Sequence, residues 1–393
     1  MFLALELWNS RTLSLALGVR LADLGGMRAV NVAIVAPTLR ILGGQAVQAD
    51  RLLKAWEGDP EVHAWLVPIN PPPPAPLERL LDIKFLRTVA TQLTYWPLLV
   101  RQLRRADVVH VFSASYLSFL LAPLPAVLVA RLLGKPVVLN YRSGEAPDHL
   151  ARSAIARTAL RRVDINVVPS TFLQQVFETF DIRAEVIPNI VDLELFAYRP
   201  RIPLQPKLLC TRNFEPLYNV GCVLDAFALI QARFPHATLT LVGKGSQAEA
   251  LRRTVSERAL RNVSFVGPVP PAEISRYYAE ADIYVQTPDI DNMPTSVLEA
   301  FASGCAVVST RAGGVPAILT DGVHGLLAPC GDHAAVAAKV IHLLENPAVA
   351  LGLTAAARES CERYRWDAVR AQWISLYRST VGSADTVAAP IGV

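Results

Sequence analysis

Residues 283–304 read IYVQTPDIDNMPTSVLEAFASG. An apolar strand ends near Thr287 and a polar turn follows. A helix is expected from Pro294, because proline suits the first helical turn, where no amide partner is needed. A buried strand that passes through a turn into a helix is the repeating unit of a parallel α/β sheet. The segment therefore predicts an α/β fold with polar residues gathered where the strand ends.

The same unit repeats on both sides of this segment. The second half has five further apolar runs, and the first half opens with NVAIVAP and continues through VVHVF and residues 136–140. These runs alternate with helical stretches, which indicates sheets buried on both faces. Between the halves, the prolines of residues 199–203 discourage either element from continuing. We expect two Rossmann-like, doubly wound domains that face each other across a ligand-binding cleft.

The composition limits the classes of partner. Of 393 residues, 52% are hydrophobic and 18% are charged, which indicates large buried cores. The net charge of +4 equals the basic surplus of residues 77–105, so no nucleic-acid partner is expected. That segment is rich in Leu and contains Tyr95 and Trp96. It suits an anionic membrane surface or a solvated helix face, and the sequence leaves both open.

Cysteine spacing and hydropathy bear on the compartment. Five widely spaced cysteines without a Cys-x-x-Cys pair predict reduced thiols in the cytosol and no zinc site. Residues 108–130 carry no formal charge, but serines and prolines interrupt them, so a buried strand and a buried helix are expected in place of a membrane span. We expect a cytoplasmic location, with peripheral contact with the inner face of the membrane left open.

The polar turn and its helix carry residue types that bind a phosphorylated sugar. The amides of Met293, Thr295 and Ser296 are expected to point into the cleft, where a helix N-terminus favours an anion. Glu299 is placed one turn further on to accept hydrogen bonds from vicinal hydroxyls, and Asp291 at the lip is placed for other hydroxyls. Taken alone, plainer roles are favoured, with Asp291 as a turn acid and Glu299 as a solvated helix residue.

These two acids, with seven residues between them, resemble the signature of the retaining glycosyltransferases of family 4, whose fold is called GT-B. The first acid is usually Glu in that family and is Asp291 here. Further motifs match in the expected order across almost the whole chain, and their shared order is more specific than any one of them. They are Gly43-Gly44, Val167–Ser170, Pro188–Asp192 with Phe196, Arg212, Gly243-x-Gly245, Phe265–Gly267, Ala302–Gly304 and Gly313–Pro316.

The resemblance implies a donor site for a UDP- or GDP-sugar, which would be a co-substrate, with no cofactor and no tightly bound metal. Glu299 would bind the ribose hydroxyls and Asp291 the hydroxyls of the donor sugar. Arg212 would neutralise the diphosphate, because the leaving nucleotide gains negative charge. The glycine turn would let amides approach the same phosphates, although a turn that serves packing alone fits as well. The remaining donor-binding candidates are Gly43, Gly44, Gly243, Lys244, Met293, Pro294 and Thr295.

The same resemblance assigns the domains. Residues 28–199 would be the acceptor domain and residues 203–361 the donor domain. Residues 362–381 would form a C-terminal helix that packs back on the first domain, and residues 382–393 a flexible tail. Residues 1–27 are expected to be an extension, because Met27 directly precedes the first convincing strand.

Three positions depart from the family pattern, one of them Ala317, which follows Pro316 where a Glu is common. Tyr218 stands about where the family has a Lys, and Lys244 is a candidate substitute for its charge. The first domain lacks the family's His after the strand near residue 140. Arg142 is expected there either as a catalytic residue, with Asp291 and Arg212, or in a salt bridge with Glu145. His110, within an apolar strand, is expected to be a core or cleft-edge residue.

We therefore predict a retaining, metal-independent hexosyltransferase that acts on a saccharide or lipid-linked acceptor in polysaccharide or glycoconjugate biosynthesis. The lipid-linked acceptor rests on the basic segment alone. The departures at Tyr218 and Arg142 keep open a catalytically degenerate relative that binds nucleotide sugars, and the fold keeps open a nucleotide-sugar epimerase. A dehydrogenase is least expected, because no strand is followed by Gly-x-Gly-x-x-Gly.

Overall fold

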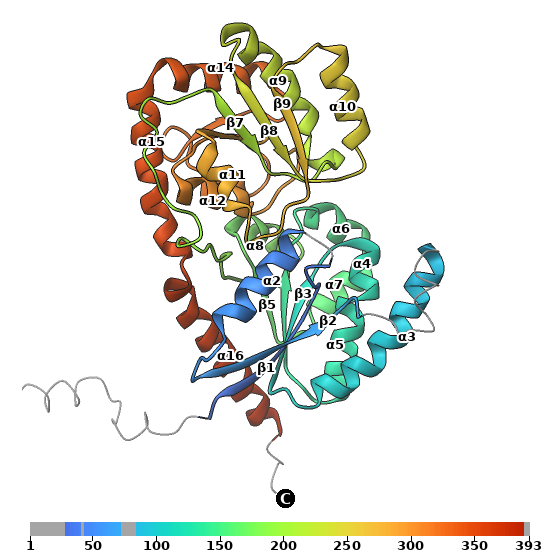
Figure 1. Ribbon diagram of the computed structural model, residues 1–393. Coiled ribbons are helices and arrows are strands. Elements are labelled where there is room, and N and C mark those ends of the chain that lie inside the picture. Colours follow the sequence, from blue (N-terminus) through green and yellow to red (C-terminus); the bar gives the residue numbers. More distant parts are fainter. Residues whose placement is uncertain (1–27, 41–42, 72–83, 389–393) are drawn as a thin grey trace, which may run out of the picture.

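The fold consists of two six-stranded parallel sheets with helices packed around each (Figure 1). The computed structural model describes residues 28–40, 43–71 and 84–388. The predicted extension, residues 1–27, lies outside these ranges. Two parallel sheets in separate halves of the chain confirm the predicted α/β fold, whereas the predicted domain boundaries remain predictions.

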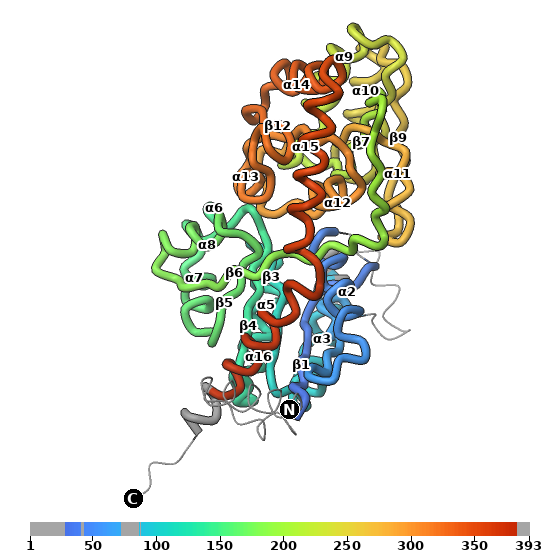
Figure 2. Tube along the Cα trace, turned by 90° about the vertical axis from the view of Figure 1, so that its left-hand side faces the viewer, coloured from blue at the N-terminus to red at the C-terminus, as the bar shows by residue number. Residues whose placement is uncertain are grey.

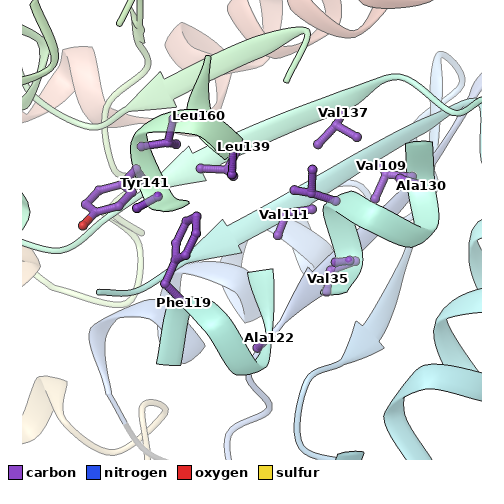
Figure 3. Close-up of a cluster of buried hydrophobic side chains, with 14 of the residues drawn as sticks. Val35, Val109, Val111, Phe119, Ala122, Ala130, Val137, Leu139, Tyr141 and Leu160 are labelled. Carbon is purple, nitrogen blue, oxygen red and sulfur yellow. The ribbon is translucent and has the colours of Figure 1, made fainter. Parts of the chain in front are cut away.

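The N-terminal sheet has the order β2-β1-β3-β4-β5-β6. Alternate residues of β1 face two different cores: Ala33 and Val35 on one side, Val32 and Ile34 on the other. Burial on both faces explains why the strands are continuous apolar runs. Figure 3 shows part of the first core. The strands are β1 (Val30–Ala36), β2 (Val62–Pro68), β3 (Val108–Ser113), β4 (Val137–Tyr141), β5 (Ile165–Val168) and β6 (Glu185–Val186).

The C-terminal sheet has the order β12-β11-β10-β7-β8-β9 and is also parallel throughout. Its strands again alternate between two cores, with Leu208 on one face and Leu209 on the other. The strands are β7 (Lys207–Cys210), β8 (Thr238–Val242), β9 (Val263–Gly267), β10 (Ile283–Val285), β11 (Ala306–Thr310) and β12 (Leu326–Ala328).

Helices connect the strands in both halves. In the first half they are α2 (Gly44–Ala55), α3 (Lys84–Leu103), α4 (Tyr116–Leu121), α5 (Pro123–Leu132), α6 (Ala146–Arg152), α7 (Ala154–Leu160) and α8 (Thr171–Glu178). In the second half they are η3 (Pro216–Tyr218), α9 (Val220–Arg233), α10 (Ala248–Glu257), α11 (Ser275–Glu280), α12 (Thr295–Ser303), α13 (Val315–Ile318), α14 (His333–Glu345), α15 (Pro347–Ser360), η4 (Cys361–Tyr364) and α16 (Trp366–Ala388).

Helix α16 returns to the N-terminal sheet after the chain has completed the second one (Figure 2). Its Val369, Trp373 and Tyr377 pack in the same core as Val32 and Ile34. Arg370 also donates to Asp59 at 2.6 Å. The helix runs to Ala388, so it extends into the range predicted as a flexible tail.

The uncharged stretch 108–130 forms the buried strand β3, as expected, and then two helices: α5 is largely buried, whereas Phe119 alone is buried in α4. In the part of the chain that the structure describes, no single helix is both long and apolar enough to cross a membrane. One helix pair, His333–Glu345 and Pro347–Gly382, meets those criteria jointly but is bent by 103°.

Candidate functional site

A cleft of about 360 Å³ lies between the two sheets and is lined by loops from both halves. Its volume is within the range of small-molecule sites. All of the predicted site residues line it, which places the glycine turn and Arg142 opposite the residues of the second half. Those residues are Gly43, Gly44, Arg142, Arg212, Gly243, Lys244, Asp291, Met293, Pro294, Thr295 and Glu299.

Helix α12 begins one residue later than predicted. Pro294 is its N-cap, with φ −66° and ψ 112°, and the helix starts at Thr295. Within the described residues, the amides of Thr295 and Ser296 have no backbone acceptor, and both residues line the cleft. Unpaired amides at a helix N-terminus attract an anion. This end of α12 is therefore suited to a phosphate.

Arg212 follows β7 and is held by two side chains of the Asp291–Ser296 loop. Its Nη2 donates to Asp291 Oδ2 at 2.6 Å, and its Nη1 donates to Ser296 Oγ at 3.2 Å. Burial lowers the pKa of Arg212 and Asp291 raises it, and the balance lies above the ordinary value. The buried Nε has no partner within the described ranges, and Nη1 and Nη2 each make one hydrogen bond, so three of the five guanidinium N–H groups remain unused.

Tyr218, the residue that replaces the expected Lys, stacks on Arg212. Its ring centre lies 4.0 Å from the guanidinium carbon. A cation over an aromatic face is held by the ring quadrupole, and the flat contact also limits the rotation of the guanidinium. Lys244 is exposed and lines the same cleft, with no hydrogen bond or ion pair for its Nζ within the described residues. Although Tyr218 stands in place of the expected Lys, Lys244 on a different loop still supplies a positive charge in the cleft.

Glu299 is buried, with 7% of its surface exposed, so the interpretation as a solvated helix residue is wrong. Its Oε1 accepts from Arg51 Nη2 at 2.7 Å, and its Oε2 accepts from the Tyr278 hydroxyl at 2.9 Å. Sequence reasoning missed both donors. Arg51 could have been identified from its spacing: it lies seven residues, or about two helical turns, after Gly44, and therefore on the same face of the helix as the glycine turn.

The glycine turn at Gly43-Gly44 is open on its outer side. A Cβ atom added at either residue would meet nothing within 4 Å, so neither glycine is required for close packing. Gly43 caps α2 in an extended conformation. By contrast, Gly243 has φ +151°, and a Cβ there would lie 2.3 Å from the carbonyl oxygen of Arg212. Glycine at position 243 therefore allows the loop that carries Arg212 and the loop that carries Lys244 to approach each other closely.

Arg142 has no ion pair among the described residues, so the predicted salt bridge with Glu145 does not form. Its Nη1 donates to Asn140 Oδ1 at 3.3 Å, and its Nη2 donates to Asn189 Oδ1. The guanidinium carbon also lies 5.1 Å from the ring centre of Phe112. Burial lowers the pKa of Arg142 to about 9. A partly buried cation without a counter-ion is suited to an anionic ligand.

His110 belongs to a buried hydrogen-bond chain behind Arg142. Asn140 Oδ1 accepts from Arg142, so its Nδ2 faces His110 Nε2 at 3.1 Å and donates to it. The proton of the ring therefore sits on Nδ1, which contacts the Tyr377 hydroxyl at 2.7 Å. Burial and, secondarily, Arg142 lower the pKa of His110 to about 3. His110 is thus a neutral core residue that links α16 to the cleft.

Two residues of the first half hold the loop before α12. Ser170 Oγ donates to Asn292 Oδ1, and Asn189 Nδ2 donates to the carbonyl oxygen of Met293 at 2.9 Å. Sequence analysis placed both residues in matching motifs but assigned them no role. Their position at the carboxyl edge of the sheet was the signal that could have identified them.

Within the described ranges, no group of three His, Cys, Asp or Glu side chains is arranged to hold a metal ion. The predicted independence from metal remains a prediction.

Family models match the two halves of the chain in succession. Residues 42–195 match the model "Glycosyltransferase Family 4", and residues 205–346 match "Glycosyl transferases group 1". The two models together match most of the chain and include all of the predicted site residues.

Several relatives align with half of the chain or more. A phosphatidyl-myo-inositol mannosyltransferase of Mycolicibacterium smegmatis is 32% identical over 50% of this chain and 52% of its own length. The sulfoquinovosyl transferase SQD2 of Arabidopsis thaliana is 25% identical over 74% of this chain and 60% of its own length. The chain thus spans between half and two thirds of these relatives.

Solved structures share the fold at low sequence identity. Anabaena Alr3699/HepE in complex with UDP-glucose has a TM-score of 0.70 and 17% identity, over 89% of this chain and 100% of that chain. Sucrose-phosphate synthase from Thermosynechococcus elongatus has a TM-score of 0.69 and 19% identity, over 90% and 100%. Both likenesses thus extend over most of the chain and concern its fold.

Proposed function

The chain is a GT-B glycosyltransferase of the family 4 type, and from this premise we propose that it is a hexosyltransferase that moves a sugar from a nucleotide-sugar donor to a saccharide or lipid-linked acceptor. The observation that carries the proposal is the environment of Arg212. A buried guanidinium with three unused N–H donors lies beside two unpaired helix amides and across from the open glycine turn. Such a group of donors suits a diphosphate.

We assign the parts of the donor to the parts of the cleft. The diphosphate contacts Arg212 and the N-terminus of α12, with Lys244 as a further cation. The ribose hydroxyls donate to Glu299, and the hydroxyls of the transferred sugar lie near Asp291. As the glycosidic bond breaks, negative charge grows on the departing diphosphate. Arg212 and the amides, already oriented before the reaction, stabilise that charge.

We further propose that the reaction retains the configuration of the sugar. Asp291 is bound to Arg212 and to the amide of Asn292, so its oxygens are occupied by donors that weaken a carboxylate as a nucleophile. This supports attack by the acceptor on the face that the diphosphate leaves, with no covalent sugar–enzyme intermediate. The expected product is the same anomer as the donor, and NMR of the product distinguishes the two anomers by the one-bond coupling constant between the anomeric carbon and its proton.

The acceptor proposal uses the surface of α3. Four of its apolar side chains are exposed, Leu86, Val89, Leu93 and Trp96, with Leu93 exposed by 66%. Arg101 lies in the last turn of the same helix. Exposed apolar residues beside basic ones favour contact with anionic lipid. Six relatives are named as mannosyltransferases of phosphatidylinositol or its monomannoside, which adds support for a lipid-linked acceptor and for peripheral contact with the inner face of the membrane.

Co-sedimentation with vesicles tests the membrane contact. The protein is expected to bind anionic phosphatidylglycerol vesicles more strongly than neutral phosphatidylcholine vesicles, and Leu93→Ser with Trp96→Ser should abolish the binding. Leu229→Ser, an exposed Leu on α9 of the other half, is the matched control. Binding that is equal on both lipids, or absent in the unaltered protein, contradicts the membrane contact.

A second candidate is a relative that binds nucleotide sugars without turnover. Tyr218 in place of a Lys and Arg142 in place of a His favour it. Turnover of any donor that is lost in Arg212→Ala excludes this candidate. Nucleotide binding without turnover, across UDP-, GDP- and ADP-sugars and acceptors of several kinds, supports it.

Calorimetric titration with UDP, GDP and ADP tests the donor site. One nucleotide is expected to bind, and Glu299→Ala is expected to abolish that binding. The base of the nucleotide that binds identifies the base of the sugar donor. If none binds, or if Glu299→Ala binds equally well, the assignment of the cleft as a donor site is wrong.

A further inference from the structure

Arg51 reaches from the first half of the chain into the ribose position proposed in the second half. It lies on α2, seven residues after Gly44, whereas Glu299 lies on α12. The two side chains form an ion pair with an N–O distance of 2.7 Å, and 11% of the Arg51 side chain and 9% of the Glu299 side chain are exposed. Arg51 Nη1 also contacts the carbonyl oxygen of Ile190 at 3.3 Å. The guanidinium is therefore fixed from two sides.

Gln48, one turn before Arg51, fixes the same part of the interface. Its Nε2 donates to the carbonyl oxygen of Ile190 at 3.0 Å, and its Oε1 accepts from the Ile190 amide at 3.0 Å. This pair of bonds sets the distance between α2 and the connecting segment at Ile190. The position of Arg51 is thus set by contacts within the first half, from which its side chain reaches across to Glu299.

The two protein donors leave part of the Glu299 carboxylate free to accept further hydrogen bonds. A carboxylate has about four lone-pair positions, two on each oxygen. Arg51 occupies one position on Oε1, and Tyr278 occupies one on Oε2. One position remains on each oxygen, and two vicinal hydroxyls carry two donors with a similar spacing. Both protein donors act on a carboxylate that is buried and lines the cleft.

We propose that Arg51 is a positioning residue for ribose recognition: it holds the carboxylate of Glu299 in the orientation that accepts both the 2′- and the 3′-hydroxyl. The inference rests on the proposed donor site and adds a residue of the opposite domain to it. Arg51 itself touches no substrate hydroxyl in this scheme. Its contribution is that Glu299 is held in one orientation and open only towards the ribose.

A consequence is that selection for ribose depends on both halves of the chain. Glu299 on the second half binds the hydroxyls, but its orientation depends on α2 of the first half. A change at Arg51 is therefore expected to weaken discrimination between ribose and 2′-deoxyribose, and not only overall affinity. A merely structural role at the interface would not affect this ratio.

The test compares a nucleoside diphosphate with its 2′-deoxy form by calorimetry, using UDP with 2′-deoxy-UDP and GDP with 2′-deoxy-GDP. The unaltered protein is expected to bind the ribose form about tenfold more tightly, because a hydrogen bond to a charged acceptor is lost in the deoxy form. Arg51→Gln should reduce that ratio to about one. Arg51→Lys, which keeps the charge but not the planar fork, should retain part of it.

Three further variants distinguish positioning from damage to the fold. Tyr278→Phe removes the other donor to Glu299 and should reduce the ratio in the same direction, so the proposal can still be tested if Arg51→Gln does not fold. In a Glu299→Gln background, Arg51→Gln should change the dissociation constant no further. Lys54→Gln, an exposed change on the same helix, should keep the full ratio.

The outcomes separate this inference from the proposed function. If the unaltered protein binds a nucleotide and discriminates against the deoxy form, but folded Arg51→Gln discriminates equally well, the role of Arg51 is refuted and the donor site stands. If the unaltered protein binds a nucleotide without discriminating, the ribose role of Glu299 is refuted together with that of Arg51. If no nucleotide binds at all, the proposed function itself fails.

Discussion

Lowering the pH from 7.5 to 5.5 is expected to destabilise the protein through His110. In the folded chain this ring is fully buried, and Asn140 donates to its Nε2. A second proton on the ring would place two donors against each other, next to the guanidinium of Arg142. Burial first, and Arg142 second, lower the pKa of His110 from 6.5 to about 3.

The sign and the size of the effect follow from linkage. Below pH 6.5 the unfolded chain takes up a proton at His110, whereas the folded chain does not until about pH 3. The unfolded state then binds more protons, so the free energy of unfolding falls as the pH falls. One such site accounts for a loss of about 1.4 kcal/mol between pH 7.5 and pH 5.5, and about the same again for the next pH unit.

Urea unfolding at several pH values measures this loss. Tryptophan fluorescence is a suitable signal, because the ring of Trp373 lies 4.7 Å from that of His110. His110→Gln is the matched variant, since its amide can accept from Asn140 and donate to Tyr377 without titrating. The unaltered protein should lose about 1.4 kcal/mol more than the variant between the two pH values. Parallel losses in the two proteins would refute the neutral, buried state assigned to His110.

Three further predictions concern the cleft and its support. Gly243→Ala places a Cβ 2.3 Å from the carbonyl oxygen of Arg212 at a φ of +151°. It should therefore lower the free energy of unfolding in urea by about 1–3 kcal/mol and weaken nucleotide binding in calorimetry. Unchanged values would show that the two loops can separate at little cost. Tyr218→Leu removes the aromatic face under Arg212 and should raise the nucleotide dissociation constant by about threefold to tenfold, whereas Tyr218→Phe, which keeps the ring, should not; equal effects would attribute the role to the hydroxyl. Tyr377→Phe removes the acceptor for the Nδ1 proton of His110 and should lower the free energy of unfolding by about 1–3 kcal/mol, and a neutral result would show that the hydroxyl is not the partner of this ring.

The pattern of apolar runs was sufficient to predict the parallel sheets. Strands buried on both faces must be continuously apolar, and that requirement is local and visible in the chain at Val32–Val35 as much as at Ile283–Val285. The end of such a strand is also local information, and the turns after the strands carry Asp291 and Arg212. For the same reason, the predicted donor residues all lie at one cleft.

The sequence pattern was less informative where a residue depends on a distant partner. Arg142 was predicted with two alternatives, and the nearby acid Glu145 was one of them. The structure instead gives it two amide acceptors, Asn140 and Asn189. Proximity in sequence favoured the wrong salt bridge, because the second partner lies 47 residues further along the chain.

By itself, the sequence determined the fold class, the two halves, and a subset of the residues that line the cleft, because each of these depends on short-range periodicity and on where strands end. Only the tertiary structure decided that Glu299 is buried between Arg51 and Tyr278, and that His110 connects α16 to Arg142. These contacts join residues from different elements and from both halves of the chain. Their geometry is set by how the two sheets pack against each other, which no local pattern encodes.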